Sequence, residues 1–387
     1  FEPEVNSVNV RLGEVVTIYY TITNQAAREF YMPNGHLVPV GQRWKMPKLA
    51  ETLRRVAEEG ADYLYTGEWA RKFVQEATKR GGRVTAQDLA EYRPRWEEPV
   101  RFTYRGHEII ASPPPDTGGL IVGYNLNILE NYDLKGMGHY AESPGALEVL
   151  VRTFGRVAAE TASVIKDPLA FNIPIELWLA KPYGKMGAQF VQQTTAKVKL
   201  SEPAETASLV QAAFADVHSG DNGALGSNHN VIVDAEGNWI SMLHTGHGGA
   251  PGVFIDGVRA TGSTARDYTT GPGRRPGAPS TAMGTPGMPP EPVTEVLVNI
   301  LDYGMGPKDA ADAPRFWATR GADRTLEIES RISKQVRDGM AERGITIRDI
   351  GPYNWNPGSM QIVWRDPASG RLHGVTDPRR LGRAAGF

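Results

Sequence analysis

A glycine–serine pair stands directly before an apolar run in the middle of the chain. Gly226 and Ser227 lead into the run 231–233, and a turn followed by a second apolar run covers residues 234–243, which predicts a β-hairpin. The stretch 219–223 breaks the Ala-rich sequence before the pair and predicts an exposed loop. A serine in front of a strand is by default an ordinary loop residue. Only the residues around it can indicate that it is a nucleophile.

These neighbours suit a serine that attacks the backbone carbonyl before it. Gly226 leaves its carbonyl accessible, the loop upstream supplies freedom, and the strand downstream holds the hydroxyl. The Ser227 hydroxyl would attack the Gly226 carbonyl, and hydrolysis of the resulting ester would free an α-amine. An α-amine has a reference pKa of about 7.7–8.0, so it can take the proton of its own hydroxyl, directly or through water. The pair therefore predicts self-cleavage at Gly226–Ser227 and a catalytic N-terminal serine.

Three histidines lie near this hairpin, at His229, His244 and His247, and the last two have an H-x-x-H spacing. That spacing presents two metal ligands on a helix, whereas here it falls on a strand followed by a glycine-rich loop, without an H-E-x-x-H arrangement. We therefore expect hydrogen-bonded or solvated histidines and no metal site.

Other loops give weaker signals. The glycine-rich stretch 246–252 fails the G-x-G-x-x-G register because Pro251 occupies the last glycine position, and no G-K-[ST] or G-x-S-x-G motif occurs. No nucleotide or other cofactor is therefore expected. The adjacent hydroxyls of Ser280 and Thr281 could bind a carboxylate, and the Pro-Gly turn in 285–288 could present backbone N–H groups to an oxyanion. Taken alone, both are ordinary loop sequences.

Composition excludes several classes of protein. The 387 residues are 40% hydrophobic and 22% charged, with a net charge of −2, which is typical of a globular protein of one or two domains and gives no electrostatic footprint for nucleic acid. No apolar run approaches the ~20 residues of a membrane span. Cysteine is absent, which removes disulfides and thiolate chemistry. The chain starts at Phe1 without a signal-like segment, so we expect it to begin inside a longer gene product, with localisation open between cytoplasm and periplasm.

The elements that must position these residues alternate between helix and strand. Periodicity and capping predict helices over residues 47–60, 61–80, 120–129, 145–166, 292–303 and 308–313, with a short one after a capping box at 85–88. Strand signals cover the ranges 15–20, 100–110 and 360–364, and 327–344 combines strand and helix.

Several motifs, none decisive alone, follow one another in an order that resembles the γ-glutamyltranspeptidase family of N-terminal-nucleophile (Ntn) hydrolases. The resemblance runs from about residue 47 to the C-terminus. It is carried by Pro47–Leu53, Gly81-Gly82 with Thr85–Tyr92, Tyr104–Gly106, Ser112–Pro115 with Gly118-Gly119, Asp167-Pro168, Leu301–Met305, Asp312–Phe316 and Asp377–Arg380.

The resemblance implies an α+β fold of four layers, αββα, in which two sheets are sandwiched by helices. A precursor of this kind cuts itself once, which here would give a large chain 1–226 and a small chain 227–387 that together form one unit. The two chains would be each other's partners, and a homodimer of such pairs is an option. The family nucleophile is normally threonine followed by Thr-His; here the run is Ser227-Asn228-His229. Serine lacks the methyl that restricts the threonine rotamer, so slower processing is expected.

Family roles carry over onto five further residues. Thr245 falls where a threonine supports the nucleophile. Ser280 and Thr281 fall near paired serines that hold the glutamyl α-carboxylate. Gly287 matches the first glycine of a Pro-Gly-Gly oxyanion turn, and Met288 replaces the second, which keeps a backbone N–H but loses the conformational freedom of glycine.

The departures from the family pattern concern the substrate. An Asn-Asn-Gln-Met-Asp-Asp-like run holds the glutamyl ammonium in the family; the corresponding range 256–262 lacks the doubled acid, and Arg259 adds a positive charge. His247 replaces an asparagine that contacts the glutamyl group. Only residues 282–284 separate the hydroxyl pair from the oxyanion turn, so either a hairpin of the core sheet is truncated or residues are missing. Arg28-Glu29 is a weak match to the family's Arg-Glu substrate motif.

We therefore predict an amidohydrolase that transfers the acyl group of a small-molecule amide to Ser227 and then to water. The acyl group is expected to be small, an acidic one being favoured by Arg259, Ser280 and Thr281. Two alternatives stay open: a true γ-glutamyltransferase or glutathione hydrolase, and an unprocessed, catalytically silent relative with a binding role.

Overall fold

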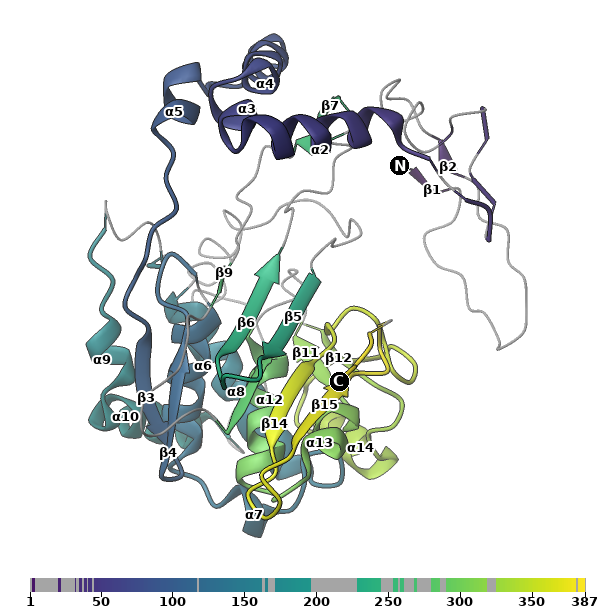
Figure 1. The fold of residues 1–387 in the computed structure, drawn as a ribbon. Coiled ribbons are helices and arrows are strands. Elements are labelled where there is room, and N and C mark those ends of the chain that lie inside the picture. Colours follow the sequence, from purple (N-terminus) through teal and green to yellow (C-terminus); the bar gives the residue numbers. More distant parts are fainter. Residues whose placement is uncertain are drawn as a thin grey trace. The chain divides into compact units, whose positions relative to one another are not determined.

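The computed structural model describes the greater part of the chain (Figure 1). The described residues are 2–3, 20–21, 32, 35–36, 38–39, 41–43, 45–116, 118–161, 164–165, 171–195, 228–244, 253–256, 258–260, 268–269, 280–285, 290–318, 325–380 and 382–386. The chain divides into two compact units, the first built from residues 1–96, 221–225 and 246–265, the second from residues 97–220, 226–245 and 266–387.

The first unit is mainly helical. Its elements are α2 (Pro47–Glu59), α3 (Asp62–Tyr65), α4 (Glu68–Lys79), α5 (Ala86–Glu91) and the short strands β1 (Glu2–Pro3), β2 (Tyr20–Thr21), β7 (Val253–Ile255) and β8 (Val258–Ala260). Helix α2 starts with proline at its first position, which suits the fixed φ of that residue. The capping box predicted for α5 is present, with Thr85 and Asp88 bonded reciprocally.

The hairpin β7–β8 is held against the helices of the same unit by polar contacts. Thr52 Oγ1 donates to the Asp256 carbonyl at 2.8 Å, Trp69 Nε1 donates to the Ile255 carbonyl at 3.2 Å, and Lys72 Nζ lies 2.7 Å from the Asp256 carboxylate. Asp256, at the turn, has a φ of 47°. Arg259 lies in β8, the strand that pairs with β7 in this hairpin.

The second unit mixes helices and sheets. Its helices are α6 (Gly118–Leu129), α7 (Leu134–Met137), α8 (Pro144–Thr161), α9 (Ile175–Leu179), α10 (Lys181–Thr194), α12 (Glu291–Leu301), α13 (Pro307–Asp312) and α14 (Lys334–Glu342). Its strands are β3 (Val100–Tyr104), β4 (His107–Ala111), β5 (Asn228–Val233), β6 (Trp239–His244), β9 (Tyr268–Thr269), β10 (Thr281–Gly284), β11 (Phe316–Ala318), β12 (Leu326–Ile328), β13 (Ile347–Asp349), β14 (Gln361–Arg365) and β15 (Leu372–Thr376).

Two antiparallel three-stranded sheets of this unit pack against each other. One has the order β5-β6-β9 and the other β10-β14-β15. Strand β10 contacts both β5 and β6, and β14 contacts β5. A third sheet, β11-β12-β13, pairs β12 with β13 in parallel, and β3 and β4 form a separate hairpin. The predicted mixture of helix and sheet is confirmed.

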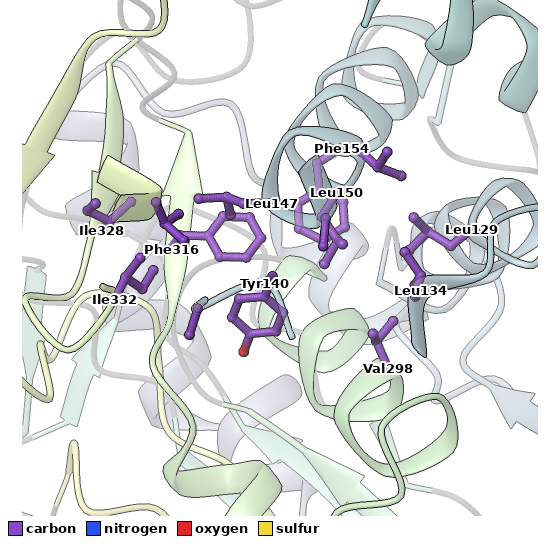
Figure 2. Packing of buried hydrophobic residues seen from close by; sticks show 14 of the residues in the cluster. Leu129, Leu134, Tyr140, Leu147, Leu150, Phe154, Val298, Phe316, Ile328 and Ile332 are labelled. Carbon is purple, nitrogen blue, oxygen red and sulfur yellow. The ribbon is translucent and has the colours of Figure 1, made fainter. Parts of the chain in front are cut away.

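Helix α6 lies at the centre of the helical part of this unit. It contacts β3, β4, α8, α9, α10 and α12, and ten of its twelve residues are buried. A helix enclosed on all sides has no need of a polar face, which explains its nearly continuous apolar sequence. The main core joins its Leu129 to Phe154 of α8, Val298 of α12 and Phe316 of β11 (Figure 2). Helix and strand segments that are far apart in the sequence therefore share one core.

Most predicted elements are confirmed, and two are wrong in detail. The range 61–80 is interrupted at Gly67, where a Cβ would lie 2.7 Å from the Tyr63 backbone, so it forms α3 and α4. The range 100–110 is two strands and not one. Arg105 and Gly106 have φ values of 49° and 80°, which turn the chain into the β3–β4 hairpin. The glycine at this turn was the missed signal.

Candidate active site

The hairpin predicted around the nucleophile is present as β5 and β6. Their antiparallel register pairs Asn228 with His244 and Val233 with Trp239. Asp234 closes the turn by accepting from the Asn238 backbone N–H at 2.7 Å, and Gly237 supplies a φ of 80°. Strand β5 therefore begins at the residue immediately after Ser227.

Most predicted site residues lie outside the described residues. These are Gly226, Ser227, Thr245, His247, Gly287 and Met288. For Arg259, the structure describes the backbone in β8, where it pairs with Phe254. For His244, it describes the backbone at the end of β6. The roles predicted for these side chains stay predictions, and what the structure contributes is the framework that leads to them.

His229 is the best-defined polar side chain beside this framework. It is 6% exposed, and its Nε2 lies 2.9 Å from Ser241 Oγ on β6. Its Nδ1 has no hydrogen-bond partner among the described residues. Burial disfavours the charged ring and lowers the pKa of His229 to about 4, so the imidazole is neutral at neutral pH. The expectation of a hydrogen-bonded histidine holds at this position.

The His229 ring packs directly on Gly284, the last residue of β10. A Cβ on Gly284 would lie 2.1 Å from His229 Nε2, so only glycine fits with the ring in this position. Ser241 Oγ also donates to the Met283 carbonyl at 3.4 Å, which connects β6 to the same end of β10. When the hydroxyl bonds that carbonyl, the imidazole Nε2 must carry the proton that it donates to Ser241. Three strands from two sheets therefore meet at this histidine.

Ser280 and Thr281 lie toward the other end of β10. Thr281 pairs with Trp364 of β14, and the Ser280 carbonyl accepts from the Arg365 N–H at 2.7 Å. At ~3.3 Å per residue, Thr281 is about 10 Å along the strand from Gly284. The two hydroxyl residues are thus adjacent to each other but removed from the His229 contact. Their predicted role in binding a carboxylate stays a prediction.

Sequence reasoning missed a buried group of charges, here called the arginine–carboxylate cluster, formed by Arg315, Arg379, Glu329 and Asp377. Arg379 bonds the two oxygens of Glu329 at 2.6 and 2.8 Å, and Arg315 pairs with Asp377. Arg379 also donates to the carbonyls of Ala311 and Ala313. All four side chains are almost completely buried. In the sequence, Arg315 and Arg379 stand out only as parts of family motifs. Each follows a proline, and that proline is the only local sign that the backbone there is tightly packed.

Glu295 of α12 lies in the field of this cluster without joining it. The residue is fully buried, and neither carboxylate oxygen has a hydrogen-bond partner among the described residues. Burial raises the pKa of Glu295 well above its usual value, against the opposing effect of Arg315 and Arg379. Burial therefore favours the protonated form of this side chain.

A polar surface depression among the described residues includes none of the predicted site residues. Arg105, Glu130, Lys135 and Asp302 are among its lining residues. Arg105 uses its guanidinium on Asp302 and on the carbonyls that end helix α6, so it stabilises a helix end. We therefore place the candidate site at the end of the packed sheets and not at this depression.

Two further findings concern the described residues alone. They contain no group of three or more histidine, aspartate or glutamate side chains arranged to hold a metal ion. Among them, no helix combines the length and the apolar character that crossing a bilayer requires.

Comparison with known proteins gives a consistent result. The sequence model of the family described as gamma-glutamyltranspeptidase matches residues 8–253 and 274–387. The acylase ACY 1 proenzyme of Pseudomonas sp. (strain SE83) is 29% identical over 369 residues, which cover 86% of this chain and 62% of the relative. The glutathione hydrolase-like YwrD proenzyme of Bacillus subtilis (strain 168) is 27% identical over 390 residues, with 93% and 69% covered.

A solved structure has the same fold over most of the chain. The cephalosporin acylase from Bacillus halodurans superposes with a TM-score of 0.65 at 22% identity, covering 94% of this chain and 66% of that one. This chain spans 62% of the length of the acylase proenzymes that it matches.

Proposed function

Because this chain belongs to the γ-glutamyltranspeptidase family, we propose that it is an Ntn-type amidohydrolase that matures by cutting its own backbone between Gly226 and Ser227. The curated relatives are called proenzymes, acylases and glutathione hydrolases, which supports hydrolysis of an amide after cleavage of a precursor. The complete fold is then the four-layer αββα sandwich, with the β5-β6-β9 and β10-β14-β15 sheets as its two central layers.

The contact between His229 and Gly284 is the observation that carries this proposal. Ser227 stands two residues before His229, and Gly287 stands three residues after Gly284. An extended chain reaches at most ~3.6 Å per residue, so the Cα atoms of Ser227 and Gly287 lie within about 7 and 11 Å of their respective anchors. The chain therefore limits how far the proposed nucleophile and the proposed oxyanion turn can lie from this contact between the two sheets.

The register of the hairpin supports the proposed partner of the nucleophile. Asn228 pairs with His244, so the next step outward would pair residue 227 with residue 245. We assign the Thr245 hydroxyl to hydrogen bonding with Ser227 Oγ on this basis. Side chains two apart on a strand share a face, so a continuation of β5 to residue 227 would place the Ser227 hydroxyl on the side of the sheet on which His229 meets β10.

The proposed reaction needs no group beyond these. The Ser227 α-amine takes the hydroxyl proton while Oγ bonds to the substrate carbonyl carbon, and the backbone N–H groups of Gly287 and Met288 stabilise the oxyanion. The ammonium then gives its proton to the leaving amine as the C–N bond breaks. Water, deprotonated by the same amine, attacks the acyl-enzyme and releases the acid with regeneration of the Ser227 hydroxyl.

The proposed substrate is an amide of a small, acidic acyl group. Arg259, Ser280 and Thr281 are the proposed contacts for its carboxylate, and His247 is assigned to the same acyl group. The doubled acid that would neutralise an α-ammonium is missing from range 256–262. A glutaryl amide and a γ-glutamyl amide differ only in that ammonium group, so the pair tests the assignment directly.

Glutathione hydrolysis is the second candidate, because relatives named glutathione hydrolase proenzyme match at 26–27% identity over 92% of this chain. A catalytically silent, uncut relative with a binding role is the remaining alternative. Proposed partners are the two products of the cut, assembled with each other and further as a homodimer of heterodimers.

The deciding experiment combines intact-mass analysis with two anilide substrates. Wild-type protein should separate under denaturing conditions into chains of about 25 and 18 kDa, in proportion to 226 and 161 residues of a 42.3 kDa chain. Ser227→Ala should remain whole and inactive. Faster release of p-nitroaniline from the glutaryl than from the γ-glutamyl substrate supports the acylase; the reverse order supports the glutathione hydrolase. An uncut wild-type chain overturns the mechanism.

A further inference from the structure

We propose that His229 is a positioning residue whose ring sets the spacing between β5 and β10, and thereby holds Ser227 opposite the oxyanion turn. The inference rests on the proposed function, since it gives the nucleophile a support that the reaction scheme does not name. The ring is fixed by Ser241 on one side and by the Gly284 backbone on the other.

The geometry of the contact favours a spacer. The ring belongs to one sheet and Gly284 to the other, so the pair lies between the sheets. A planar ring 6% exposed and hydrogen-bonded to Ser241 has few alternative positions. Absence of a side chain at position 284 lets the ring lie on the β10 backbone, and any larger residue would force the two strands apart. Ring and glycine are therefore complementary in shape.

Proton transfer is the competing role for this histidine, and the contacts speak against it. Nε2 is committed to Ser241, and that hydroxyl also lies against the Met283 carbonyl. The other ring nitrogen, Nδ1, is buried without a hydrogen-bond partner among the described residues, and burial lowers the pKa of the ring to about 4, so the imidazole is a weak base at neutral pH. Spacing, in contrast, requires only that the ring remain where it is. Displacing a reacting group by ~1 Å can cost on the order of 100-fold in rate. A spacer two residues from the proposed nucleophile can therefore have a large effect on the rate of cleavage.

The test uses three variants at the contact and follows the self-cleavage rate by intact mass, with kcat for the cut enzyme measured alongside. Gly284→Ala pushes the strands apart and should slow cleavage on the order of 100-fold. His229→Ala, which removes the spacer, should slow it similarly. His229→Gln retains an N–H near the place of Nε2 and much of the bulk of the ring. The strands should then shift by well under 1 Å, and the self-cleavage rate should stay within about tenfold of the wild-type rate.

A double variant and a matched control separate positioning from stability. His229→Ala with Gly284→Ala puts a methyl where the ring was, so it should cleave faster than Gly284→Ala alone. Val336→Ala, at a fully buried position of α14, should lower the thermal midpoint without slowing cleavage in the folded protein. If Gly284→Ala does not fold, the comparison of His229→Gln with His229→Ala decides.

Each outcome has one meaning. Wild-type cleavage with an unaffected His229→Ala variant overturns the spacer while leaving the proposed function intact. Equal loss in the Gln and Ala variants, with a changed pH profile in both, overturns it in favour of proton transfer. A wild-type chain that never cuts removes the proposed function itself. Loss in His229→Ala with retention in His229→Gln supports the spacer.

Discussion

At the scale of single residues, the chemistry proposed for this chain depends on one hydroxyl group and its rotamer. Ser227 has no γ-methyl, so its side chain explores more χ1 states than threonine would. The α-amine can serve as base only when the hydroxyl lies beside it. A serine as the proposed nucleophile therefore has the required hydroxyl but lacks the rotamer restriction of threonine, so its surroundings would have to supply that restriction.

This argument predicts the effect of Ser227→Thr. The added methyl limits the side chain to fewer rotamers, so self-cleavage should become faster, by up to about fivefold for ~1 kcal/mol of restricted freedom. The measurement is a time course of intact mass after rapid purification, with Ser227→Ala as the uncut control. Slower cutting in the threonine variant would mean that space, and not rotamer freedom, limits the reaction.

His229 makes folding stability depend on pH in a defined direction. Its pKa is about 4 in the folded protein and about 6.5 when solvated, so the unfolded chain binds the extra proton between these values. The stability contribution is complete above pH 6.5 and is lost as the pH falls to 4, by about 3 kcal/mol. Chemical denaturation of wild type and His229→Gln at pH 7 and pH 4.5 checks this. The difference between the two proteins should shrink or reverse at the lower pH; parallel curves would contradict it.

At the scale of elements, close helix packing decides where small residues are required. Helix α10 crosses α6 so closely that a Cβ on Gly184 would lie 2.4 Å from the Asn127 carbonyl oxygen. Gly155, in the middle of α8, has open space around the corresponding position. Helix packing therefore requires a glycine at position 184 but does not require one at position 155.

This contrast gives a matched pair of substitutions. Gly184→Ala must push against backbone and should destabilise the protein by about 1–3 kcal/mol. Gly155→Ala meets nothing, gains helix propensity, and should stabilise by about 0.5–1 kcal/mol. Free energies of unfolding from urea titrations distinguish the two. Equal effects would show that helix propensity, and not the contact, controls both positions.

At the scale of the whole molecule, the two chains produced by the proposed cut would share one hydrophobic core. Leu129, Leu147 and Phe154 precede the cut, whereas Val298 and Phe316 follow it, and all belong to one hydrophobic cluster (Figure 2). Burial of that apolar surface does not depend on the bond between residues 226 and 227.

The cut protein should therefore behave as one particle. Size-exclusion chromatography of fully processed material should give one peak that contains both chains, and only denaturant should separate them. The single-chain Ser227→Ala protein is the reference for elution volume. Separate elution of the two chains under native conditions would mean that the shared core is insufficient to hold them.

Local sequence was enough to identify the hairpin and the helices that start with clear signals. Alternating apolar residues and the turn at 234–238 predicted β5 and β6, because side-chain period and turn chemistry act over a few residues. Proline near the start of α2 and the capping box of α5 predicted where these helices begin, because capping also acts over a few residues. The chemistry expected of a serine after a glycine also came from the sequence alone.

Only the tertiary structure revealed which distant residues share a space. Nothing in the sequence near His229 or Gly284 announces that they touch, because strands of different sheets meet through faces and not through neighbouring residues. The burial of Glu295 and the pairing of Arg379 with Glu329, fifty residues away, likewise follow from packing of the whole chain. Local patterns specify elements through short-range sterics and hydrogen bonds, whereas a site depends on how those elements pack, and that is decided by the total surface they bury together.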